Sequence, residues 1–167
     1  VENATDVGGK RTVYDDYAAL KFAVTGAAQF SLGAASGTGS WQDYAETVRI
    51  SLAGRARGDV RQYVKFRDQA KNETAEYTVE YVYETQGNVR GKVTLEGSGD
   101  PTTVSVLISA AGASAVTPGA NGDYTILGVE RGSYTIKLSA AGYEDAQQLV
   151  LVNAGKDASV PETQLKR

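Results

Sequence analysis

The chain has 167 residues, of which 41% are hydrophobic and 22% are charged, and this balance excludes a wholly disordered protein. The net charge of −3 argues against nucleic acid as a partner, because no basic stripe is present to neutralise phosphates. Cysteine and histidine are both absent, which excludes disulfides, thiolate zinc sites and the commonest general base.

Before residue 84, short apolar runs separated by turn signals predict a series of strands. The predicted strands cover residues 12–24, 29–32, 47–52, 60–67 and 75–83. Asp15 and Asp16 interrupt the first run, and a loop rich in glycine, alanine and serine occupies residues 33–39. The stretch 68–72 predicts a turn.

Residues 84–88 predict a domain boundary, because one β-prone run ends there and another begins. Further strands are predicted at residues 89–95, 103–108, 147–152 and 158–160. Within residues 121–143, apolar and polar side chains alternate along two more strands. The short connection 129–132, which ends in Gly132, predicts that these two strands form an antiparallel hairpin.

Many short strands without a long amphipathic helix are typical of β-sandwiches. We therefore expect an all-β chain made of two tandem small antiparallel β-sandwiches, at residues 1–86 and 87–167. No run of 18 apolar residues occurs, so no membrane insertion is expected in this fragment. The absence of methionine predicts a processed chain or an excised piece of a larger protein.

The second half carries an ordered set of glycine-led motifs. They are Gly91-Lys92-Val93, Gly122-Asp123-Tyr124, Gly132-Ser133-Tyr134 and Gly142-Tyr143, with a β-prone strand at residues 103–108 between the first two. In this order they resemble the carboxypeptidase regulatory-like family, whose members fold as transthyretin-like (prealbumin-like) sandwiches. The resemblance covers residues 87–161 and implies structural roles for seven residues: Tyr124, Ile126, Gly132, Tyr134, Ile136, Gly142 and Tyr143.

The first half resembles an immunoglobulin-like module of bacterial surface and secreted proteins. The residues that carry this resemblance are Phe30-Ser31-Leu32, Trp41 with Tyr44, the strand 48–52, and the run from Tyr63 to Asp68. Lys71-Asn72 stands where the family usually has Gly-Asn, so one of these two residues is expected in a left-handed conformation. The module carries no catalytic residues and implies an accessory or spacer role.

Trp41 and Tyr44 are the candidate ligand-binding residues, because aromatic faces stack on sugar rings. The alternative is that Trp41 packs against the sandwich core, as large aromatic side chains commonly do. Asp15, Asp16 and Asp68 offer oxygen ligands of the kind that calcium prefers, but they show no calcium-loop spacing. We interpret them as turn and bend residues, and we expect no metal site and no cofactor.

A Lys92–Asn153 isopeptide cross-link is a further alternative. Lys92 falls on the polar side of its strand, which argues against the apolar environment that a reactive lysine needs. No serine-nucleophile elbow and no convergent pair of carboxylates can be identified, so the chain is not expected to be an enzyme.

The sequence thus favours non-catalytic spacer or interaction modules of a larger secreted or cell-surface bacterial protein, located outside the cell or in its envelope. The alternative function is a carbohydrate-binding accessory module of an extracellular enzyme or adhesin. Neighbouring domains of the same polypeptide are the expected partners, with polysaccharide or another surface protein as further candidates.

Overall fold

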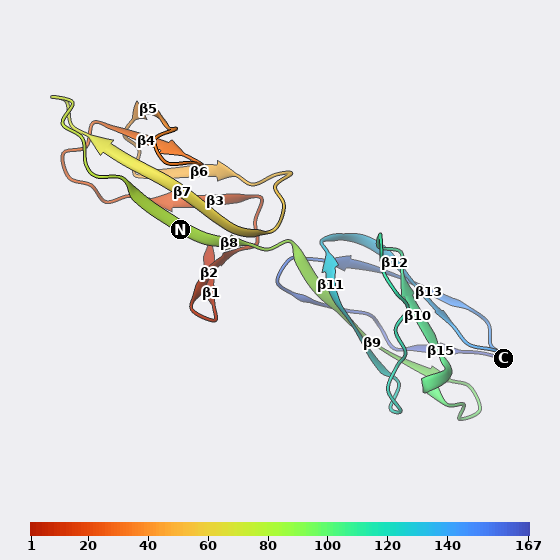
Figure 1. Ribbon diagram of the computed structural model, residues 1–167. Coiled ribbons are helices and arrows are strands. Elements are labelled where there is room, and N and C mark those ends of the chain that lie inside the picture. The colour runs from red at the N-terminus through yellow and green to blue at the C-terminus, as the bar shows by residue number, and fades with distance from the viewer. The chain divides into compact units, whose positions relative to one another are not determined.

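Strands account for nearly all of the regular structure in the computed structural model, which describes all 167 residues (Figure 1). Helical structure is confined to one 3-10 turn, η1 (Pro101–Thr103), whose first turn is capped by the Asp100 side chain. The chain divides into Val1–Glu84, here called unit 1, and Thr85–Arg167, called unit 2. The expected all-β fold class is confirmed.

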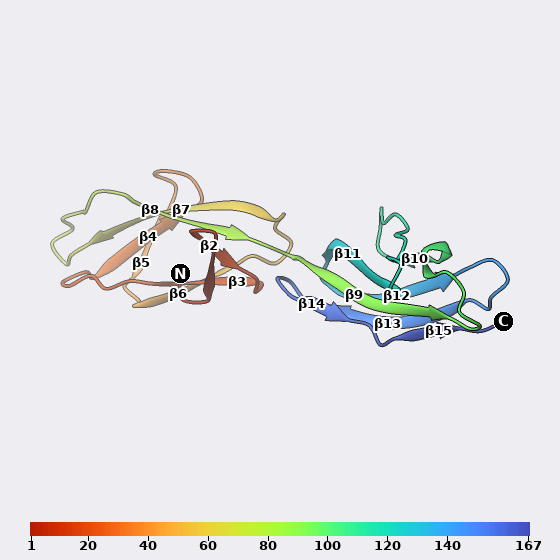
Figure 2. The same cartoon turned by 90° about the horizontal axis from the view of Figure 1, so that it is seen from below.

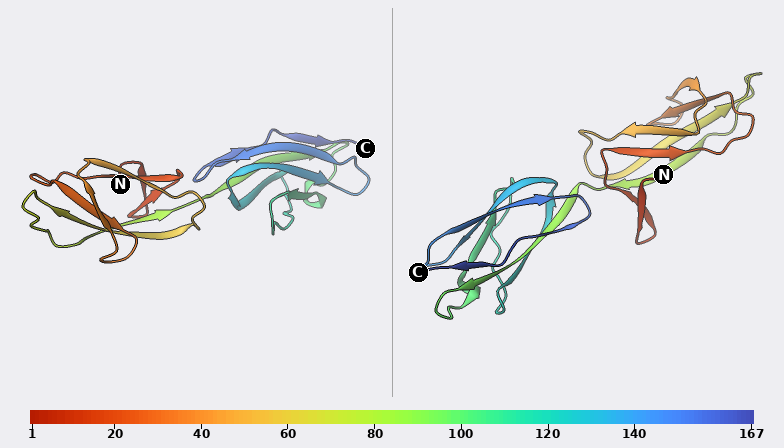
Figure 3. Two further views of the ribbon diagram at one scale, coloured as in Figure 1. Left: turned by 90° about the horizontal axis from the view of Figure 1, so that it is seen from above. Right: turned by 180° about the vertical axis from the view of Figure 1, so that it is seen from behind.

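Unit 1 contains two sheets that face each other. Its strands are β1 (Ala4–Val7), β2 (Lys10–Val13), β3 (Tyr17–Lys21), β4 (Gln29–Gly33), β5 (Ser40–Asp43), β6 (Thr47–Ser51), β7 (Gly58–Arg67) and β8 (Tyr77–Tyr83). The larger sheet has the order β1-β2-β8-β7-β4-β5, and β3 pairs with β6 in the smaller one. Only β2 and β8 pair in parallel. The β1–β2 hairpin projects from the body of the unit (Figure 3).

The core of unit 1 lies between these sheets in two adjoining clusters. One contains Val13, Leu52 and Tyr83, and the other is built on aromatic side chains. Phe22 and Phe66 meet edge to face, with ring centroids 5.2 Å apart. The core-facing residues of β7 are Val60, Gln62, Val64 and Phe66, and the residues between them, Arg61, Tyr63 and Lys65, lie on the outer face of the larger sheet.

Unit 2 also has two sheets, whose strands overlap in the view of Figure 2. Its strands are β9 (Gln86–Leu95), β10 (Ser105–Ile108), β11 (Asp123–Glu130), β12 (Gly132–Ser139), β13 (Ala146–Val152), β14 (Asp157–Ser159) and β15 (Thr163–Leu165). One sheet has the order β10-β12-β13. In the other, β9 pairs antiparallel with β11 and in parallel with both β14 and β15. A single apolar cluster fills the space between them.

The predicted hairpin within residues 121–143 is wrong. β11 pairs with β9, whereas β12 pairs with β10 and β13, so the two consecutive strands belong to opposite sheets. Arg131 alone separates them, and its N–H donates to the Thr85 carbonyl at 2.9 Å. The chain crosses over the sandwich edge at this point, and the apolar faces of both strands meet in the core.

The glycine-led motifs of unit 2 are explained by close contacts with tyrosine rings. Gly91 lies opposite Tyr124 in the β9–β11 register, and a Cβ atom at position 91 would overlap the phenol ring. Gly132 lies under the ring of Tyr134, and a Cβ atom at position 132 would lie 3.2 Å from the Tyr134 hydroxyl oxygen. The two tyrosine rings therefore pack directly on the backbone at positions 91 and 132, where a side chain would collide with them.

Candidate functional site

Trp41 lies on the outer face of the larger sheet of unit 1. It pairs with Ser31 of β4, which in turn pairs with Lys65 of β7, so the three residues share one row of the sheet. Their face is opposite to that of the buried core residue Phe30. The indole is partly exposed, and the Arg67 guanidinium carbon stacks on it at 4.3 Å from the ring centroid. Trp41 is therefore a surface residue and does not belong to the core.

A small pocket of about 100 Å³ adjoins Trp41. Tyr63 and Lys65 line it from β7, Glu73 and Glu76 line it from the β7–β8 connection, and the loop 35–39 closes it. Lys65 and Glu73 form an ion pair at 3.4 Å. The pocket thus combines two aromatic side chains with a cation and two carboxylates, which is a donor and acceptor set suited to a polyhydroxyl ligand.

The loop that closes this pocket is held by Glu76. Ser36 Oγ donates to one carboxylate oxygen at 2.5 Å, and the Gly37 N–H donates to the other at 2.9 Å. The Ser36 hydrogen bond, followed by that of Gly37, lowers the pKa of Glu76. Gly39 brings the loop so close to β4 that a Cβ atom there would overlap the Ser31 hydroxyl. Glu76 remains ionised near neutral pH and fixes the pocket rim.

Tyr44 does not join Trp41 in one platform. Its ring packs on Phe66 with centroids 6.2 Å apart, and it contacts the aromatic core cluster. Its hydroxyl donates to the Phe22 carbonyl at 3.1 Å and accepts from the Val24 N–H at 3.3 Å. The structure therefore separates the two residues: Tyr44 joins the strands around the core, and Trp41 alone faces outward.

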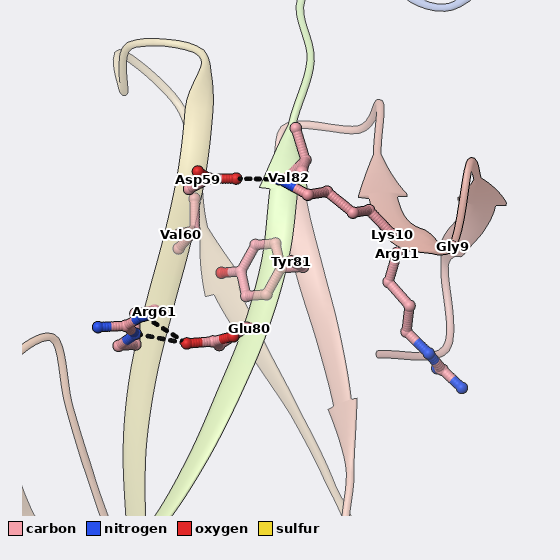
Figure 4. Close-up of a pocket in the computed structure, with 9 residues that line it drawn as sticks. All are labelled: Gly9, Lys10, Arg11, Asp59, Val60, Arg61, Glu80, Tyr81 and Val82. Atoms are coloured by element: carbon pink, nitrogen blue, oxygen red, sulfur yellow. Dashed lines mark hydrogen bonds and ion pairs between the residues drawn. The ribbon is translucent and has the colours of Figure 1, made fainter.

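A concavity of about 590 Å³ lies over β2, β7 and β8 (Figure 4). Two cross-strand ion pairs occupy it: Arg61 Nη2 lies 2.6 Å from Glu80 Oε1, and Lys10 Nζ lies 3.5 Å from Asp59 Oδ1. All four side chains are more than half exposed, so each pair contributes little to stability. These four charged groups thus neutralise one another in pairs, and the Arg11 guanidinium, which also lines the concavity, donates to the Val1 carbonyl at 2.8 Å.

The candidate calcium ligands serve local structure. Asp68 accepts from the Asn72 N–H at 2.9 Å within its turn, and Lys71 has the left-handed φ of 67°. Asp15 accepts from the Asn3 amide at 2.9 Å, and Asp16 accepts from the Tyr83 hydroxyl at 3.3 Å. No group of three acidic side chains is arranged to hold a metal ion.

Lys92 and Asn153 are not brought together. Lys92 is exposed and pairs with Asp123 of β11. The Asn153 carbonyl lies beside Gly87, near the opposite end of β9. An isopeptide cross-link between them would require the strand to be rebuilt, so the structure contradicts this alternative.

Five of the seven residues to which the resemblance assigns structural roles lie in the core of unit 2 or against it, and the other two are glycines. Tyr124, Ile126 and Ile136 are buried in the core of unit 2, and Tyr134 and Tyr143 pack against it. The two glycines of the set are Gly132, under Tyr134, and Gly142, which has a φ of 80° in the turn before Tyr143.

Sequence reasoning did not single out Tyr63 or Glu76 of the Trp41 pocket. Tyr63 alternates with buried residues along β7 in step with Lys65, and this alternation places it on the outer face. That signal was available in the sequence. The position of Glu76 depends on the fold of a loop that no periodicity describes.

Comparison with known proteins identifies relatives of unit 2. Residues 88–166 match the family model of the carboxypeptidase regulatory-like domain. No curated protein sequence matches the chain. No helix of the structure has the length and apolar character of a membrane span.

Three solved structures share low sequence identity with the chain. The Bacillus anthracis TIE protein is 15% identical with a TM-score of 0.47, and the alignment covers 90% of this chain and 34% of that one. The group B streptococcus pilus 2b backbone protein is 13% identical with a TM-score of 0.39, covering 98% and 89% respectively. A Bacteroides ovatus mixed-linkage glucan utilization locus protein, SGBP-B, solved with a mixed-linkage heptasaccharide, is 15% identical with a TM-score of 0.23, covering 96% and 45%.

This chain thus spans about a third of the Bacillus anthracis chain. The TM-scores of all three structures lie below 0.5, so no property of these proteins is carried over to this chain. The family-model match carries more weight, because it agrees with the glycine and tyrosine motifs of unit 2. The expected carboxypeptidase regulatory-like domain is confirmed for residues 88–166.

Proposed function

We propose that this chain is a pair of non-catalytic β-sandwich modules, an immunoglobulin-like one at residues 1–86 and a carboxypeptidase regulatory-like one at residues 87–167. They act as a spacer within a larger secreted or cell-surface bacterial protein. Their role is to set the distance and limit the motion between neighbouring domains of the same polypeptide.

The observation that carries this proposal is the short connection between the units. β8 ends at Tyr83 and β9 begins at Gln86, so only Glu84 and Thr85 lie between them. The Glu84 N–H donates to the Val13 carbonyl at 3.0 Å, and the Thr85 carbonyl accepts from the Arg131 N–H at 2.9 Å. Each connecting residue is therefore tied to its own unit, which restricts the free rotation that linked domains normally have.

Distance measurements between spin labels test the proposal. The chain has no cysteine, so exposed Thr78 and Gln147 can be replaced by Cys and labelled without background. We expect a narrow distribution of label distances. A control chain with a Gly-Ser insertion between Glu84 and Thr85 should give a broad one. Equal widths in the two chains would overturn the spacer proposal.

Carbohydrate binding is the second candidate function, and the surface position of Trp41 favours it. A sugar ring could stack beside the indole while Lys65, Glu73 and Glu76 exchange hydrogen bonds with its hydroxyls. Trp41, Tyr63 and Lys65 lie on strands of the sheet, and Glu76 is fixed by its hydrogen bonds to the closing loop, so little ordering is left to occur on binding.

A glycan array followed by affinity gels on the purified chain tests this candidate. Trp41→Ala should abolish any binding while the far-UV circular dichroism stays unchanged. Tyr17→Ala is a matched control, because Tyr17 lies on the other sheet and also carries a guanidinium, that of Arg49, at 4.7 Å. Retention of binding in Trp41→Ala would exclude this site.

A further inference from the structure

The first and last strands of unit 2 lie side by side and run in the same direction. β14 pairs with β9 from Asn88 to Arg90, and β15 pairs with it from Val93 to Leu95 (Figure 2). The chain enters β9 at Gln86, and it leaves β15 at Leu165, which lies beside Leu95. The entry point and the exit point therefore lie at opposite ends of β9.

Backbone hydrogen bonds are spread along the whole strip. They run from Asn88 N to the Lys156 carbonyl at 3.0 Å, from Val160 N to the Arg90 carbonyl at 2.8 Å, and from Glu96 N to the Leu165 carbonyl at 3.0 Å. Leu165 and Val160 are also buried in the core of the unit, so sliding of the strip would expose apolar surface as well as break these bonds.

Side chains reinforce the same strip. Asp157 of β14 accepts from the Asn88 amide at 2.8 Å and pairs with Arg90 at 2.9 Å, both on β9. At the far end, the Glu96 carboxylate accepts from the Arg167 N–H at 3.0 Å. The two strands thus carry cross-links near both ends of their contact.

We propose that this strip, β9 with β14 and β15, is a clamp that resists tension applied along the chain. Tension pulls β9 and β15 in opposite directions along their common axis, so all of the hydrogen bonds between them are loaded in shear together. Antiparallel strands pulled from one end would open bond by bond. The inference rests on the proposed spacer function, for which resistance to tension is the relevant property.

Unit 1 has a weaker version of this arrangement. β2 and β8 pair in parallel only over Thr12↔Val82 and Val13↔Tyr83. Ala4 lies opposite Val13 in the β1–β2 hairpin, so tension that reaches Ala4 peels β1 from β2 one bond at a time. We therefore expect unit 1 to yield before unit 2 when the whole chain is stretched.

Single-molecule stretching of the full chain from both ends tests the clamp, since forced unfolding reports the unfolding barrier. Thr94 and Gln164 are register partners on β9 and β15, so Thr94→Cys and Gln164→Cys can form a disulfide. The disulfide carries the tension directly from β9 to β15 and keeps the residues between them from extending. It therefore identifies which unfolding event belongs to unit 2. Two unfolding events are expected in the reduced double variant. Oxidation should remove the stronger one, and the reduced sample is the matched control.

The direction of loading provides the second arm. Ser98→Cys, in the exposed turn after β9, and a Cys added after Arg167 place both handles at the same end of the strip. Unit 2 should then open at a lower force than when the chain is pulled from both ends, because the bonds are broken in sequence instead of together.

Two results would overturn the clamp: loss of the weaker event on oxidation, or equal forces for the two directions of loading. Either would leave the spacer proposal standing if the spin-label distances remain narrow. Conversely, a flexible connection between the units would remove the spacer proposal without altering the force at which unit 2 opens.

Discussion

Removal of a single hydroxyl group from the core of unit 2 should stabilise the protein. The Tyr124 side chain is 4% exposed, and its hydroxyl has no hydrogen-bond partner. Burial raises the pKa of this phenol, as expected of a polar group taken out of water. Tyr124→Phe keeps the ring that covers Gly91 and removes only the unsatisfied oxygen.

The expected gain follows from the cost of an unsatisfied buried polar group, about 1–3 kcal/mol. Taking the lower end, Tyr124→Phe should raise the free energy of unfolding of unit 2 by about 1 kcal/mol. For a unit of this size, such a gain raises the Tm by about 4–8 °C. Tyr143→Phe is the matched control: its hydroxyl donates to the Glu96 carbonyl at 3.2 Å, so its removal should cost about 0.5–1 kcal/mol.

The single tryptophan makes the assay specific. Trp41 lies in unit 1, so its fluorescence follows the unfolding of that unit alone, whereas far-UV circular dichroism follows both. In urea titrations, Tyr124→Phe should move the unfolding transition of unit 2, seen by circular dichroism, to higher urea. The transition of unit 1, seen by fluorescence, should stay unchanged. The reasoning is refuted if Tyr124→Phe destabilises unit 2 as much as Tyr143→Phe does.

Two further predictions concern a glycine and a carboxylate. Gly91→Ala should destabilise unit 2 by about 1–3 kcal/mol, because the added methyl overlaps the Tyr124 ring; an unchanged urea midpoint would contradict this. The lowered folded-state pKa of Glu76 means that its stabilising effect is complete above its ordinary value of 4.5 and is lost as pH falls through the lowered value. The protection factor of the Gly37 amide, which corrects the measured rate for the intrinsic slowing of exchange in acid, should therefore fall on acidification in the wild type. This acid-dependent loss of protection should be absent in Glu76→Gln.

Most of the core strands could be predicted because their apolar residues alternate with polar ones. β1, β5 and β15 could not, since Ala4–Val7 is four residues long, Ser40–Asp43 contains one apolar residue and Thr163–Leu165 is three residues long. Short strands of this kind are held by their neighbours in the sheet, and their own sequences carry too few residues for a period to be visible. β15 nevertheless matters most for the proposed clamp.

The candidate site could be predicted only in part, because strand pairing decides on which face each side chain lies. A lone tryptophan marks either a core or a surface platform, and only the pairing of Trp41 with Ser31 and Lys65 decides between them. Tyr44 lies three residues along the chain, but the strand ends at Asp43 and the chain turns inward, so proximity in sequence did not mean a shared face.

The crossing between β11 and β12 shows why alternation alone misled. A strand with one apolar face has the same pattern whether its neighbour in the chain is hydrogen-bonded beside it or stacked against it across the core. The connection decides between the two: a single residue, Arg131, is too short for the two-residue turn of a tight hairpin. Gly132 follows with a φ of 157°, under the ring of Tyr134. Because the chain crosses to the other sheet after β11, β9 pairs with β11 on one edge and with β14 and β15 on the other. The alternation of apolar residues could not reveal this crossing, and the proposed clamp depends on it.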